Sequence, residues 1–194
     1  MLVSHVEPMH RGHQERLAPL VAKAMAEAEL SFDQLERVAV TIGPGSFTGL
    51  RVGLAFAKGL GQALAIPVIG VGTLEAIAAP FADRPGVIFA VLTAKPGHVF
   101  AQAFEGGQPV SIPNDLTIDA AVALLDQLSE SGPITLVGTS LDLFPRVGAE
   151  RVLVEQADPV IIARLAERQP ILPPQPLYLR APDAKLPGGR DLLP

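Results

Sequence analysis

The sequence predicts an α/β fold, from the spacing of its strands and helices and from its composition. A buried strand at 37–42 runs into a glycine-rich loop and a helical segment to about residue 65, and a second apolar strand follows at 67–72. A strand, a crossover helix and a parallel strand form the repeating unit of α/β folds. Apolar residues make up 48% of the 194-residue chain and charged residues 18%, so the chain can form a core and is not disordered.

The segments on either side of this unit also alternate between strand and helix patterns. Residues 2–7 have the alternation of a short strand, and from His13 apolar residues recur at helical spacing to Ala28. The other expected elements are a helix at 74–81 capped by Thr73, a hairpin of strands at 87–93 and 98–104, a helix at 118–128, strands at 134–137 and 151–154, and a helix at 159–167.

A turn-rich boundary at 82–86 predicts two lobes. Residues 1–84 would form an N-terminal lobe, and residues 85–194 would form a second lobe whose Pro-rich tail should be largely irregular. We find no internal repeat in the sequence.

Charge and composition exclude several classes of function. The net charge is −5, and the interval between Lys95 and Arg146 contains acidic but no basic residues. Direct nucleic-acid binding draws on Lys and Arg, so if this protein works on RNA, we expect a partner to hold the RNA. The absence of Cys excludes disulfides and thiolate sites. No signal peptide or membrane span is predicted, and we expect a cytoplasmic protein.

The loop Gly43-Pro-Gly-Ser-Phe-Thr-Gly49 leads into a helix. Unpaired N–H groups at a helix N-terminus suit an anion, although the pattern is neither a P-loop nor a dinucleotide fingerprint. The alternative is a tight turn capped by Ser46, with Arg51 in an ordinary salt bridge. The candidate anion-binding residues are Gly43, Gly45, Ser46, Thr48 and Arg51.

Small residues recur every fourth position on the helix after this loop. Each glycine inside a helix costs up to about 1 kcal/mol, so the pattern indicates a close approach of another backbone. That backbone belongs either to the chain's own sheet or to a partner helix, and the first helix also has a small-residue strip at 18, 22 and 26. The candidate interface residues are Leu17, Val21, Ala22, Met25, Gly49, Gly53, Ala57 and Gly61.

No constellation of catalytic or metal-ligating residues is evident. His10 and His13 stand without a third ligand, and there is no His-Glu-x-x-His or Gly-x-Ser-x-Gly motif. We therefore expect no catalytic residues and no metal site in this chain.

The string Ile42-Gly-Pro-Gly-Ser-Phe-Thr-Gly-Leu-Arg51 resembles a signature of the TsaB (YeaZ) family of bacterial tRNA threonylcarbamoyl-adenosine biosynthesis proteins. The segments Ile69–Glu75 and Pro176–Arg180, and His13 with Leu17 and Pro19, are similar to further family elements. The resemblance implies an actin-like ATPase fold of two ribonuclease-H-like lobes.

The resemblance also implies a role as a non-catalytic subunit that stabilises the catalytic paralogue, TsaD, which attaches threonylcarbamoyl to an adenosine next to the tRNA anticodon. A TsaE-like ATPase joins the assembly. The N-terminal helices form the contact, and through them the chain alone would form a homodimer. The partner complex would use ATP and Mg²⁺, and this chain alone would bind no cofactor.

Two departures from the family pattern alter these expectations. Members usually begin with a strand and hairpin before the position of Met1, so the N-terminal lobe should lack its first hairpin, and an exposed sheet edge would invite self-association. Thr93–Phe100 replaces a segment that often carries an acid and paired basic residues. The alternative function is an actin-fold ATPase or phosphotransferase that uses the loop 43–49, which would need a Mg²⁺-binding carboxylate that the sequence does not show near this loop.

Overall fold

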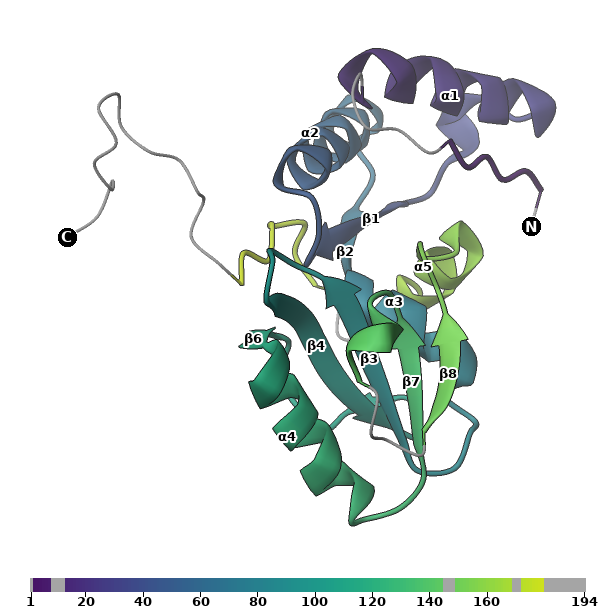
Figure 1. Ribbon diagram of the computed structural model, residues 1–194. Helices are drawn as coiled ribbons and strands as arrows, with labels where there is room; N and C mark the ends of the chain where they lie inside the picture. Colours follow the sequence, from purple (N-terminus) through teal and green to yellow (C-terminus); the bar gives the residue numbers. More distant parts are fainter. Residues whose placement is uncertain (1, 8–12, 145–148, 169–171, 180–194) are drawn as a thin grey trace, which may run out of the picture.

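The computed structural model describes residues 2–7, 13–144, 149–168 and 172–179, which fold into two sheets with helices around them (Figure 1). The smaller sheet has two parallel strands, β1 (Val38–Gly43) and β2 (Val68–Gly72), and the larger sheet has six strands. The larger sheet contains β3 (Val87–Thr93), β4 (His98–Glu105), β5 (Gln108–Pro109), β6 (Asn114–Thr117), β7 (Ile134–Gly138) and β8 (Glu150–Leu153).

The helices confirm most of the expected elements. They are α1 (His13–Glu27), α2 (Phe47–Leu64), α3 (Thr73–Ala78), α4 (Ile118–Ser129) and α5 (Pro159–Leu165). Gly72 rather than Thr73 is the N-cap of α3. Residues 2–7, predicted as a strand, pair with no strand in the described part of the chain; the side chains of His5 and Glu7 instead bond to Glu27 and Arg16 of α1.

The larger sheet runs in the order β5-β4-β3-β7-β8, with β6 also paired to β4. β4 is antiparallel to β3, whereas β7 is parallel to both β3 and β8. Its main core lies toward α4, where Phe89, Leu125 and Phe144 are fully buried. The larger sheet thus combines antiparallel and parallel strands, whereas the smaller sheet has only its two parallel strands among the described residues.

The helix that follows each sheet's last strand packs against the other sheet: α3 follows β2 and α5 follows β8. Leu74 and Ile77 of α3 share a core cluster with Ile88 of β3. Leu165 and the following Ala166 cluster with Ile69 and Val71 of β2. The strands thus divide between residues 72 and 87, near the predicted boundary, but α3 and α5 cross between the lobes and tie them together.

Candidate functional site

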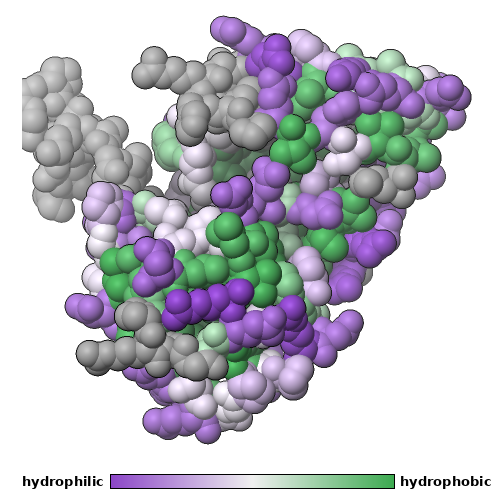
Figure 2. Space-filling view, turned by 45° about the vertical axis from the view of Figure 1, so that its right-hand side comes forward, coloured by the Kyte–Doolittle hydropathy of each residue, from purple (hydrophilic) through white to green (hydrophobic). Residues whose placement is uncertain are grey.

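The helix α1 has an apolar face that the rest of the chain covers only in part. None of residues 15–27 is buried. Leu17, Val21 and Met25 are half-buried and Ala22 is exposed, and apolar side chains remain visible in the upper part of the molecule, where α1 lies (Figure 2). An amphipathic helix normally buries its apolar stripe, so this face is suited to a protein partner.

The small residues of α2 turn largely toward the chain's own sheet. Ala57 and Gly61 are buried, and a Cβ at Gly61 would lie 2.3 Å from Cγ2 of Val68 in β2. A Cβ at Gly53 would lie 3.9 Å from Cγ2 of Val40 in β1. The interface expectation for Ala57 and Gly61 is therefore corrected: these two residues let α2 approach its own sheet closely. An interface role for Gly49 and Gly53, both half-buried, remains a prediction.

The loop before α2 forms the tight turn that was the alternative to an anion site. Ser46 is the N-cap of α2, and its Oγ accepts a hydrogen bond from the N–H of Gly49 at 3.3 Å. Gly43 has φ +114°, and a Cβ there would lie 3.0 Å from the carbonyl oxygen of Leu177. Only glycine suits this conformation, because side chains rarely adopt it. Thr48 is exposed.

Arg51 is bound within the chain. Its guanidinium carbon lies 3.8 Å from the ring centre of Phe47, and its Nε donates a hydrogen bond to the hydroxyl of Tyr178 at 3.0 Å. The rings of Phe47 and Tyr178 lie 5.3 Å apart, centre to centre. Arg51 thus holds the segment 172–179 against the start of α2. These contacts explain the placement of its side chain without a bound anion.

A cavity of about 590 Å³ lies at the carboxyl ends of the parallel strands of both sheets. Gly45 and Ser46 line it after β1, and Thr73 lines it after β2. The hydroxyl of Thr93 in β3 lies 3.0 Å from that of Thr139. Of the five predicted anion-binding residues, only Gly45 and Ser46 line this cavity. The five residues therefore do not form one site.

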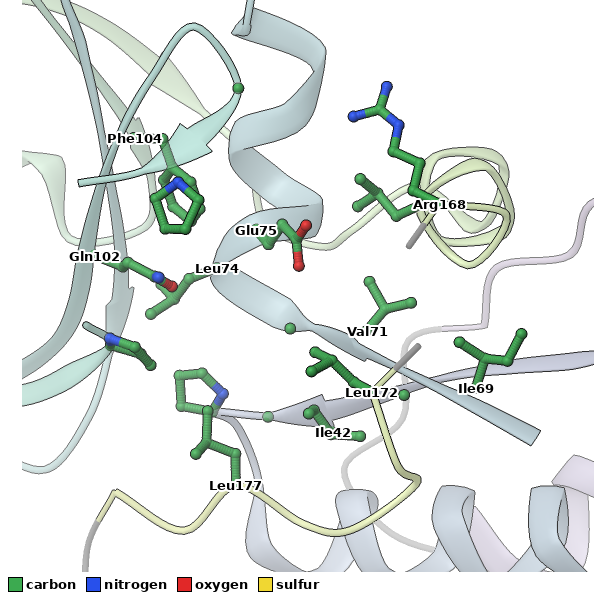
Figure 3. Close-up of a pocket in the computed structure, with 18 of the residues that line it drawn as sticks. Ile42, Ile69, Val71, Leu74, Glu75, Gln102, Phe104, Arg168, Leu172 and Leu177 are labelled. Atoms are coloured by element: carbon green, nitrogen blue, oxygen red, sulfur yellow. The ribbon is translucent and has the colours of Figure 1, made fainter. Parts of the chain in front are cut away.

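A second cavity of about 380 Å³ lies between β2, α3, β4 and α5 (Figure 3). Gly43 lines it, as do Leu74, Gln102 and Phe104. Burial raises the pKa of Glu75 above its ordinary value, although the charge of Arg168 and the N–H of Gly72 each lower it. The sequence reasoning assigned no role to Glu75. Its position three residues after the N-cap Gly72, as in a capping box, is the signal that could have found it.

No group of three or more His, Cys, Asp or Glu side chains that could hold a metal ion occurs within the part of the chain that the structure describes. In the same part, no helix has both the length and the apolar character needed to cross a membrane. His10 lies outside the described residues.

The chain is similar in sequence and in fold to proteins that have been described before. The family model for "TsaD: tRNA N6-adenosine threonylcarbamoyltransferase" matches residues 6–127. The solved structure of YeaZ from Pseudomonas aeruginosa superposes with a TM-score of 0.74, covers 91% of this chain and 89% of its own, and shares 23% sequence identity. The fold is therefore that of the actin-like ATPases, with ribonuclease-H-like units.

Sequence relatives narrow this class. An uncharacterized protein of Mycobacterium leprae is 36% identical to this chain. The matched region covers 90% of this chain but only 46% of that relative's length. The Escherichia coli tRNA threonylcarbamoyladenosine biosynthesis protein TsaB is 28% identical over 87% of this chain and 75% of its own length. The chain belongs to the TsaB (YeaZ) family.

Proposed function

We propose that this protein acts in tRNA threonylcarbamoyladenosine biosynthesis as a non-catalytic subunit that binds and stabilises a TsaD-like paralogue. The E. coli relative is named for this pathway, and the TsaD family model covers residues 6–127, which fits a pair of paralogous folds. A TsaE-like ATPase would join the assembly, tRNA would be held only through it, and ATP and Mg²⁺ would serve the complex.

The observation that carries the proposal is the open apolar face of α1. Leu17, Val21 and Met25 are half-exposed along this helix, and Ala22 beside them is exposed. A paralogue that covered this face would bury apolar area, and the small side chain of Ala22 would allow a helix to approach closely. The same face could support a homodimer when the paralogue is absent.

The test is a binding experiment between the 194-residue chain and the TsaD-like paralogue of its own organism. Size-exclusion chromatography with light scattering should show a one-to-one complex. Ala22→Glu and Met25→Glu should each weaken it at least about tenfold, because a charge would be buried without a partner. Ala123→Glu is the matched control, since Ala123 is an exposed helical alanine on α4.

Substitutions at Ala57 or Gly61 would not test this interface, because both residues are buried against the chain's own sheet. A complex that tolerates both Ala22→Glu and Met25→Glu would contradict the proposal. So would the absence of any complex with the paralogue.

The alternative function is an actin-fold ATPase or phosphotransferase with its nucleotide at the loop 43–49. It is favoured by the hydroxyl-lined cavity that includes Ser46 and Thr93, and it is weakened by the engagement of Arg51 with Tyr178. Titration calorimetry of the chain alone with Mg-ATP separates the two functions. We expect no binding, and tight binding would favour the enzyme.

A further inference from the structure

The cavity between β2, α3, β4 and α5 is bounded by both sheets and by the segment 172–179. Its volume of about 380 Å³ lies within the range of sites that bind small molecules, roughly 300–1,000 Å³. Leu172 and Leu177 form one wall. The carbonyl oxygen of Leu172 accepts a hydrogen bond from the N–H of Gly70 at 2.9 Å. The N–H of Leu177 donates to the carbonyl oxygen of Ile42 at 2.7 Å, so this wall is fixed to both strands of the small sheet.

The lining of this cavity is mostly apolar and contains a few polar side chains. The large apolar side chains are those of Ile42, Ile69, Val71, Leu74, Phe104, Leu165, Leu172 and Leu177. The polar side chains are those of Glu75, Gln102, Gln108 and Arg168. The amide nitrogen of Gln102 donates to the carbonyl oxygen of Ser111 at 3.1 Å. Such a lining is typical of a site for a small organic molecule, whose orientation the polar groups determine.

The carboxyl group of Glu75 has no partner of opposite charge. Of the described lining residues only Glu75 and Arg168 are charged, and neither forms an ion pair with any residue of the described ranges. In Figure 3 the carboxyl group of Glu75 lies among the lining side chains, whereas the guanidinium of Arg168 points away from it. An ionised carboxylate in apolar surroundings costs free energy unless a cation pairs with it. The cavity therefore suits a ligand that supplies this cation.

We propose that this cavity binds a small apolar molecule that carries one protonated amino group. The ammonium group pairs with the carboxylate of Glu75 through charge-assisted hydrogen bonds, and the apolar body lies against Val71, Leu74 and the two leucines of the segment 172–179. An apolar carboxylic acid fits less well, because it brings a second negative charge beside Glu75. The described residues of α1 do not line the cavity, so the site is tested separately from the proposed function.

Three probes with one apolar body and different head groups test the proposal: phenylbutylamine, phenylbutanol and phenylbutyrate. Each is titrated into the isotope-labelled 194-residue chain and followed by two-dimensional NMR. The amine should bind at least about tenfold more tightly than the alcohol or the acid, because only the amine pairs with Glu75. The largest shifts should occur at the amides of Gly70, Gly72 and Gln102, which line the cavity.

Glu75→Gln removes the charge and keeps the size of the side chain. It should weaken binding of the amine at least about tenfold and leave binding of the alcohol unchanged. Glu130→Gln is the matched control, since Glu130 is exposed at the end of α4 and does not line the cavity. This control should bind the amine like the unmodified chain, which separates the site from general attraction of a cation to a chain with a net charge of −5.

Several results would overturn the proposal. They are an amine that does not bind at millimolar concentration, an alcohol or acid that binds as tightly as the amine, shifts confined to amides outside the cavity, and equal effects of Glu75→Gln and Glu130→Gln. If Glu75→Gln does not fold, the pH dependence of the unmodified chain decides.

The pH dependence has a definite sign. Burial raises the pKa of Glu75, although the nearby charge of Arg168 lowers it. The amine needs the ionised carboxylate, so its affinity should increase as the pH rises through this raised pKa, while Arg168 and the amine both stay charged. The affinity of the alcohol should not increase in this way. An amine affinity that is independent of pH across this range would overturn the pairing with Glu75.

Discussion

Arg51 shows how a single side chain acquires its role from a distant part of the chain. Its hydrogen-bond partner Tyr178 is 127 positions away in sequence, and its guanidinium also lies on the ring of Phe47. Its position near the start of a helix left open whether Arg51 binds an anion or forms an ordinary salt bridge. Contact with two aromatic rings instead stabilises a cation in place and fastens the segment 172–179 to α2.

Glu75 supports a prediction about pH. Burial raises the pKa of its carboxyl group above the ordinary value, so the folded chain binds this proton more tightly than the unfolded chain does. The free energy of unfolding should therefore fall as the pH rises from the unfolded pKa to the folded one, with no further contribution above it. Glu75→Gln should lack this fall. Urea unfolding of both proteins from about pH 4 to about pH 8 measures it, and parallel pH curves would contradict it.

At the scale of elements, the contrast between α1 and α2 determines which surface is open. Both helices have small residues at four-residue spacing, which predicted close approach without naming the partner. In α2 the partner is the chain's own sheet, because Ala57 and Gly61 are buried there. In α1 the strip that contains Ala22 is exposed. The spacing is the same, and only packing distinguishes the two roles.

Two glycines of α2 offer a matched pair of substitutions. A Cβ at Gly61 would lie 2.3 Å from Val68 and 3.0 Å from the carbonyl oxygen of Ile66, whereas a Cβ at Gly59 would meet nothing within 4 Å. Gly61→Ala should therefore destabilise the fold by about 1–2 kcal/mol through overpacking. Gly59→Ala should stabilise it by about 0.5–1 kcal/mol through helix propensity. Thermal or urea unfolding compares them, and equal effects would contradict the assigned packing.

For the molecule as a whole, the exchange of α3 and α5 between the two sheets makes the lobes interdependent. The core of the small sheet includes Leu165 and Ala166 from the far end of the chain. The core of the large sheet includes Leu74 and Ile77, which directly follow the small sheet. Neither sheet keeps its full core if the chain is divided near residue 84.

We therefore predict that Leu165→Ala destabilises both lobes together. Leu165 is 9% exposed, and its truncation should cost about 2–4 kcal/mol by analogy with other buried leucines. Unfolding followed by far-UV circular dichroism and by hydrogen exchange in β1 and β7 should shift by the same amount. Separate transitions, with only the small sheet affected, would show that the lobes are independent.

Much of the fold could be predicted from the sequence, because it depends on local patterns. The helical spacing after His13, the apolar runs at β1, β2 and β3 and the turn residues between them are determined by neighbours within a few positions. Ser46 as the cap of α2 follows from the same local chemistry. The short strands β5 and β6 were missed, because two to four residues carry too little periodicity.

The fold class and the family could be predicted from the sequence, since each depends on nearby residues or on a motif. Only the folded structure shows which small-residue strip is buried, that Arg51 binds Tyr178 and that Glu75 lines a cavity. The physical reason is that burial and pKa depend on contacts between distant segments, and those contacts exist only once the chain has folded.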